Sequence, residues 1–165
     1  MRRVASGLML IMLLASSLSL VSDIQSARAE PRTIFIRTDG SIDPPTANVT
    51  TSDKITYAFT GNNTGSLIVQ RSNIVIDGRD YLLKGQDFGY GLNLTLLNHV
   101  VIGNMTIKRF QIGVFLRWSQ HINVSGIKIT ENTANGIMLA ETRSAKNTAY
   151  YNNVTSNHRV GKATQ

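Results

Sequence analysis

Apolar and polar residues follow one pattern that occurs twice between residues 98 and 139. The two copies are HVVIGNMTIKRFQIGVFL (99–116) and HINVSGIKITENTANGIML (121–139). Apolar residues stand at matching positions, so that Val100 matches Ile122, and Gly113 matches Gly136 after one extra residue in the second copy. A period of about 20 to 50 residues is typical of stacked repeats, in which each repeat covers the core of its neighbour. The pattern therefore predicts a solenoid.

Within each repeat, apolar residues stand two positions apart and are mostly β-branched, as in Ile74-Ile76 and Val100-Ile102. This alternation is typical of strands, and no stretch after residue 29 has the spacing of an amphipathic helix. Asn and Gly, which adopt left-handed backbone angles at turns, separate the apolar groups. We therefore predict an all-β fold, a parallel β-helix of about four coils, each rising by the strand spacing of about 4.8 Å.

The period divides the chain into four parts. We assign residues 1–29 to a signal peptide, 30–65 to N-terminal strands that form a β cap, 66–157 to the coils and 158–165 to an irregular end. Residues 30–65 contain strand patterns without the period, and a solenoid needs atypical terminal units. At the other end, Lys-Ala-Thr (162–164) stands where an apolar strand belongs. That end is interpreted as a polar cap, a frameshift or a truncation of a longer protein, and an open β edge there predicts end-to-end self-association.

Residues 1–29 have the order of a secretory signal peptide. Met1-Arg2-Arg3 precedes a short apolar run from Leu8, and Ala27-Arg28-Ala29 is a small-x-small cleavage site. The predicted mature chain starts near Glu30, and the protein is expected to be secreted or to lie in the cell envelope, extracellular or periplasmic. An uncleaved membrane anchor is the alternative.

Charge and cysteine content narrow the function classes. After removal of residues 1–29, 14 basic and nine acidic residues remain, a net charge of +5. These charges are spread along the chain, whereas nucleic-acid binders concentrate basic residues on one face, so we expect no nucleic-acid partner. The chain has no cysteine, which excludes disulfides, thiolate chemistry and cysteine-based zinc sites.

Two stretches carry a resemblance to a known family. TGNNTGSLIVQRSNIVIDGRDYLLKG (60–85), followed by NVSGIKITENTANGIML (123–139), resembles the right-handed parallel β-helix repeat proteins of the pectin-lyase-like fold. More narrowly, it resembles the NosD-like branch found among exported archaeal proteins. The resemblance covers residues 33–157, and NIVIDG (73–78) is its most specific part. It implies the fold, but this architecture carries lyases, hydrolases, binding proteins and surface scaffolds alike.

His99 and His121 are the candidate metal ligands. Equal positions in adjacent coils place two imidazoles about 5 Å apart, close to the strand spacing, where they could share copper or zinc. The copper-binding label of NosD-like proteins favours copper. The next coil has Lys146 at this position, and duplication of a turn residue is the alternative explanation.

Asp77, Asp80 and Asp87 form a local acidic cluster, the residue type that polysaccharide hydrolases use for acid and base catalysis. However, Asp77-Gly78 is a tight-turn dipeptide, and the next coils have Gly103 and Ser125 in place of Asp77. We therefore predict no catalytic residue among them.

Two pairs of neighbouring residues, Lys108-Arg109 and Arg117-Trp118, are the candidate ligand-binding residues. A basic group beside a uronate carboxylate, often with calcium, is typical of polysaccharide lyases. Trp118 with Arg117 could stack on a sugar ring. The spacing places the two pairs on different faces of one coil, and a solvated exterior is the alternative for both.

Six Asn-x-Ser/Thr sequons are candidate N-glycosylation sites if the organism has the machinery, although β-helix turns favour Asn in any case. They are Asn48, Asn62, Asn93, Asn104, Asn123 and Asn153.

We expect a non-enzymatic, exported β-helix repeat protein that acts as a surface or extracellular scaffold, or as a module that binds polysaccharide along one face. The alternatives are a fragment of a polysaccharide lyase or glycoside hydrolase, and a NosD-like periplasmic copper-handling protein. The expected protein has no cofactor, whereas the alternatives would use calcium or copper.

Overall fold

The computed structural model describes residues 32–141 and 146–158, and within them the chain forms strands and no helix. The predicted signal peptide at 1–29 lies outside the described residues, and so does all of the predicted irregular end at 158–165 except residue 158. In the part described, no helix has the length and hydropathy needed to cross a membrane.

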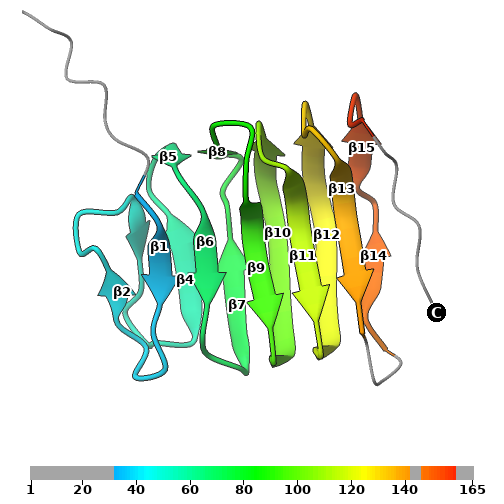
Figure 1. Ribbon diagram of the computed structural model, residues 1–165. Helices are drawn as coiled ribbons and strands as arrows, with labels where there is room; N and C mark the ends of the chain where they lie inside the picture. The colour runs from blue at the N-terminus through cyan, green and yellow to red at the C-terminus, as the bar shows by residue number, and fades with distance from the viewer. Residues whose placement is uncertain (1–31, 142–145, 159–165) are drawn as a thin grey trace, which may run out of the picture. The chain divides into compact units, whose positions relative to one another are not determined.

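Successive coils follow one another along the solenoid in chain order, while β2 and β3 lie beyond β1 and β4 at the first end of the stack (Figure 1). Their bounds are β1 (Ile34–Ile36), β2 (Ile42–Asp43), β3 (Val49–Thr50), β4 (Thr56–Phe59), β5 (Asn63–Thr64), β6 (Leu67–Val69), β7 (Ile74–Asp77), β8 (Leu82–Lys84), β9 (Tyr90–Thr95), β10 (Asn98–Lys108), β11 (Ile112–Arg117), β12 (Gln120–Thr130), β13 (Asn135–Ala140), β14 (Thr148–Tyr150) and β15 (Asn153–Thr155).

Strands of successive coils lie side by side in parallel and build two sheets. The six-stranded sheet has the order β13-β11-β9-β6-β1-β2, and the nine-stranded sheet runs β14-β12-β10-β7-β4-β3, with β5, β8 and β15 paired beside this path. Val100 lies opposite Ile122 and Val114 opposite Ile137, which are the pairs that the sequence period predicts. The predicted all-β solenoid of about four coils is therefore confirmed.

The first described strands combine both pairing types. β1, β4 and β5 pair in parallel with β6, β7 and β8, so residues 32–65 already contribute a layer to the stack. β2 and β3 pair antiparallel with β1 and β4 and follow them in the strand order of the two sheets. An antiparallel partner satisfies the backbone groups that the first parallel strand would otherwise expose.

Residues with left-handed backbone angles recur at equivalent corners of the coils. The four columns are Asn73, His99, His121 and Lys146; Asn104, Gly126 and Tyr151; Asp87, Arg109, Glu131 and Ser156; and Leu96, Trp118 and Glu141. Such angles cost a residue with a Cβ roughly 1–2 kcal/mol, so a corner keeps them only where the stacked coils impose the same turn.

Apolar side chains stack in columns through the interior. One column is Ile76, Ile102 and Val124, and another is Leu83, Ile107 and Ile129, all buried. Burying each such side chain stabilises the fold by about 1.5–3 kcal/mol, which suits a chain without disulfides. The core is therefore built from the alternate residues that the sequence pattern marks as inward.

The fourth coil is held by amide side chains. Asn147, Asn152 and Asn157 each accept a hydrogen bond at Oδ1 from a backbone N–H of the third coil at 3.0 Å. Each also donates from Nδ2 to a backbone carbonyl slightly earlier in that coil, at 2.7 to 3.1 Å. These bonds join this coil to the third one, so the strand register continues where the apolar repeat weakens.

Gly91, Gly113 and Gly136 lie at equivalent positions near the starts of β9, β11 and β13. A Cβ placed on Gly113 would lie 2.6 Å from both the Gly136 carbonyl oxygen and Ile129 Cγ2. The Gly136 oxygen belongs to the backbone and cannot move without shifting the next coil. Close stacking of the coils therefore requires glycine here.

Gly113→Ala is expected to lower the free energy of unfolding by about 1–3 kcal/mol, the usual cost of overpacking a filled site. Chemical denaturation followed by far-UV circular dichroism measures this loss. Gly61→Ala is the control, because the atoms nearest to its added methyl group belong to the Asn48 side chain, at 3.2 Å or more, and not to the backbone of a neighbouring coil. An equal effect of both substitutions would contradict the close-stacking argument.

Candidate functional site

The outer surface of the six-stranded sheet is the candidate site, and we call it the aromatic face. Its strands bury alternate residues, such as Leu92 and Leu94, and turn the others outward. The central outward column is continuous through five strands, with every member half-buried. It consists of Phe35, Ile68, Asn93, Phe115 and Met138.

Two aromatic rings from neighbouring coils form a platform on this face. Tyr90 at the start of β9 and Phe115 in β11 stack with centroids 4.3 Å apart and planes inclined by 7°. Both side chains remain half-buried rather than enclosed. Stacked rings are worth about 0.5–1.5 kcal/mol beyond the area that they bury, so the platform is a stable surface.

Arginines stand over two further rings. The Arg37 guanidinium lies 4.1 Å from the centroid of Phe35, and that of Arg117 lies 3.9 Å from the centroid of Trp118. Arg37 is also ion-paired with Asp43. Arg117 donates from Nε and Nη2 to Glu141 Oε2, at 3.1 and 2.9 Å.

Arg117 and Trp118, two of the candidate ligand-binding residues, thus contact each other. A guanidinium held by a ring and a carboxylate is pre-organised, and its remaining N–H donors can bind carboxylates or hydroxyls. The arrangement therefore offers partly exposed aromatic rings with fixed donors beside them.

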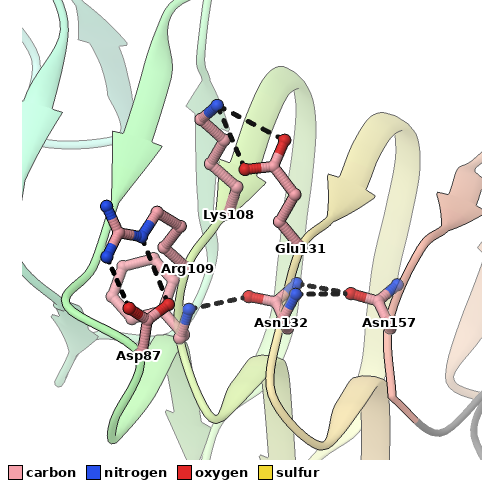
Figure 2. Close-up of polar contacts among 7 residues, drawn as sticks. Asp87, Lys108, Arg109, Glu131, Asn132 and Asn157 are labelled. Carbon is pink, nitrogen blue, oxygen red and sulfur yellow. Dashed lines mark hydrogen bonds and ion pairs between the residues drawn. The ribbon is translucent and has the colours of Figure 1, made fainter.

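Lys108 and Arg109 lie elsewhere, at the corner after β10 (Figure 2). Arg109 donates from Nε and Nη2 to the two oxygens of Asp87, at 3.2 and 2.5 Å. These hydrogen bonds hold the pKa of Asp87 below its usual value and raise the pKa of Arg109. Lys108 Nζ lies 3.4 Å from Glu131 Oε2. Both basic residues therefore join coils, on a different face from Arg117.

The buried side-chain amide of Asn132 lies next to this corner. Asn132 Oδ1 accepts a hydrogen bond from the Phe110 backbone N–H at 2.9 Å, and its Nδ2 donates to Asn157 Oδ1 at 2.8 Å (Figure 2). Asn132 is only 2% exposed. The Asn132 amide thus links the second, third and fourth coils, and it binds the Phe110 backbone N–H at a position where this N–H has no strand partner.

The two histidines lie against each other at another corner. Their rings stack with centroids 4.4 Å apart and an angle of 4° between the planes, as expected for equal positions in adjacent coils. His121 Nδ1 lies 3.0 Å from Asn98 Oδ1. Nitrogen lone pairs lie in the ring planes, so those of stacked rings point along parallel directions and do not converge on one ion. Within residues 32–141 and 146–158, no group of three or more His, Cys, Asp or Glu could hold a metal.

The acidic residues serve separate turns. Asp77 Oδ1 accepts hydrogen bonds from the Arg79 N–H at 3.0 Å and from Asn104 Nδ2 at 3.1 Å. Gly103 and Ser125 continue the Asp77 column, as the spacing predicts. Asp87 binds Arg109. Both carboxylates therefore bind residues in the turns and corners between strands.

The sequons differ in exposure. Asn48, Asn62, Asn104 and Asn153 are exposed, whereas Asn93 and Asn123 are half-buried. Asn93 points outward on the aromatic face and accepts a hydrogen bond from Thr95 Oγ1 at 2.6 Å. Asn123 donates to the Tyr150 hydroxyl at 3.2 Å, a bond that lowers the pKa of Tyr150.

Sequence reasoning missed the aromatic face because it followed only the inward columns. The signal was present, since Asn93, Phe115 and Met138 follow one another at the repeat period. The same period therefore places an outward column on one sheet, although it does not show that Tyr90 reaches Phe115.

Comparison with known proteins gives one family match. The family model described as "Periplasmic copper-binding protein (NosD)" matches residues 16–164. No curated protein and no solved structure matches the chain.

Asn132→Leu is expected to lower the free energy of unfolding by about 1–3 kcal/mol, because the buried Phe110 N–H loses its acceptor. Urea denaturation measures the change. Asn153→Leu is the matched control, since this exposed side chain has no hydrogen bond within the described residues. If the two variants are equally stable, the buried amide does not hold the coils together.

Proposed function

The chain belongs to the NosD family, and on this premise we propose that it is an exported β-helix repeat protein that binds polysaccharide along the aromatic face without catalysing a reaction. The family is described as periplasmic. The leader expected at residues 1–29 agrees with export. The family description names neither a polysaccharide nor the surface that would bind it.

The observation that carries the proposal is the Tyr90–Phe115 platform on the same sheet as Arg117 and its ring partner Trp118. A pyranose ring has an apolar C–H face and a rim of hydroxyls, so it suits a surface of partly exposed aromatic rings with fixed donors beside them. Asn93 and Thr95 add polar groups along the same strand.

The repeat itself favours an elongated ligand. Successive coils rise by about 4.8 Å, close to the advance of one sugar along an extended polysaccharide. Outward residues in one column, from Phe35 to Met138, can thus meet successive sugars of one chain that runs along the solenoid. A small compact ligand would use only one or two of these positions.

The absence of catalysis is proposed from the carboxylates. Glycoside hydrolysis needs two carboxyl groups that flank one bond. The Asp77 column continues with Gly103 and Ser125, and Asp87 is bound by Arg109. A lyase-type calcium site would need more carboxylates than these turns supply.

Copper, which the family description names, does not fit the stacked histidines. A single ion in the plane of the His99 ring would lie out of the plane of His121, because the two rings are parallel. Copper handling is therefore the second candidate function, supported by the family description, with no role assigned to this pair.

Binding of the purified chain to a polysaccharide array, followed by calorimetry on the best ligand, tests the proposed function. Phe115→Ala and Arg117→Ala are each expected to weaken binding about tenfold, the effect of losing about 1.4 kcal/mol at a central contact. Val101→Ala is the control, because this residue is 41% exposed on the nine-stranded sheet. Equal binding by all variants, or no binding by the unsubstituted chain, would refute the proposal.

A copper(II) titration tests the stacked histidines. We expect the same copper affinity for the unsubstituted chain and for the double variant His99→Ala, His121→Ala, since the parallel rings do not chelate one ion. Electron paramagnetic resonance would report nitrogen ligands directly. Loss of a bound copper in the double variant would show that the two imidazoles rearrange to bind it.

A further inference from the structure

A hollow lies where the chain passes from β8 to β9, at the corner that leads into the six-stranded sheet. It is shallow and open to solvent, and its cavity volume is about 60 Å³. Its lining includes Thr33 and Ser66, each directly before a strand of that sheet, and Gln86 and Phe88 from the turn. Phe110 also lines it and is only 1% exposed.

The turn that carries Phe88 is held on both sides. Before it, Asp87 donates its backbone N–H to the Arg109 carbonyl at 2.7 Å, and its carboxylate binds the Arg109 guanidinium. The Asp87 carbonyl accepts a hydrogen bond from Thr133 Oγ1 at 3.2 Å. After it, the Gly89 carbonyl accepts two backbone hydrogen bonds at 3.1 Å. Phe88 nevertheless remains 66% exposed, so the fold holds this ring at the rim of the hollow instead of burying it.

Polar groups of the wall are free for a ligand. Within the described residues, the side chains of Thr33, Ser66 and Gln86 have no hydrogen-bond partner. Among the described residues of the lining, none is charged. The hollow therefore offers two hydroxyls, one amide and an aromatic edge, which suit a neutral ligand that has both an apolar face and hydroxyl groups.

The shape and position of the hollow indicate one sugar ring held at an open rim. Because the hollow is open, a ring would lie partly inside it, with one face against Phe88 and the other toward solvent. Tyr90 follows Phe88 closely in the chain and stacks on Phe115, so the hollow adjoins the aromatic face. A polysaccharide that runs along that face would pass beside this corner, where a sugar branching from it could enter the hollow.

We propose that the hollow binds a single neutral hexose, either free or as a side branch of the polysaccharide that lies on the aromatic face. Phe88 stacks on the apolar face of the sugar, and Gln86, Ser66 and Thr33 bind its hydroxyls. The inference rests on the proposed function for the identity of the longer ligand, but the hollow binds a free monosaccharide on its own.

The test is a titration of the full chain with neutral hexoses (glucose, galactose, mannose) and with glucuronate and galacturonate, followed by saturation-transfer NMR. A neutral hexose is expected to bind with a Kd of about 1 mM, the weak affinity that suits one small open site. Phe88→Ala and Gln86→Ala should each weaken it at least fivefold. Tyr151→Ala, which removes a ring that is 90% exposed in the fourth coil, should leave it unchanged.

The outcomes separate this inference from the proposed function. Polysaccharide binding that depends on Arg117, without hexose binding, would overturn the hollow alone. Hexose binding that depends on Phe88, without polysaccharide binding, would support the hollow and overturn the aromatic face. Tighter binding of the uronates than of the neutral hexoses would overturn the neutral ligand. Circular dichroism of Phe88→Ala and Gln86→Ala confirms that each variant is folded before its affinity is compared.

Discussion

Parallel backbone hydrogen bonding between successive coils is the constraint on which the rest of the structure depends. Once β10 pairs with β12 along most of their length, each residue lies on its equivalent in the next coil. Every coil must then turn at the same places, which explains the left-handed angles at His99 and His121 and at Arg109 and Glu131. The pairing also satisfies backbone groups that a buried chain could not leave unpaired.

This constraint divides the residues of each coil into two groups. Inward positions are limited by the neighbouring coil, as at Gly113, where the Gly136 carbonyl leaves no room for a methyl group. Outward positions meet no such limit, so they can carry ligand-binding chemistry without disturbing the stack. The platform of Tyr90 and Phe115 and the exposed ring of Phe88 are both of this kind.

The candidate site was partly predictable from the sequence. The contact of His99 with His121 follows directly from the period, and Arg117 meets Trp118 because they are neighbours in the chain. Asp87 and Arg109 are also one period apart, so their ion pair could have been read from the same spacing. The stacking angle of the histidines could not, because it depends on the backbone angles of two corners and on the fit between the rings.

The sequence by itself determined the all-β class, the coil length and the residues of the inward columns. These depend on burial of apolar area, which is non-directional and leaves a regular trace in the order of residues. Only the tertiary structure decided which outward side chains meet. Tyr90 lies opposite Ile112 in the strand register, yet its ring stacks on Phe115, and Thr133 reaches past the neighbouring coil to Asp87. The paths of the corners and the directions of side chains set these contacts, and neither leaves a periodic pattern in the chain.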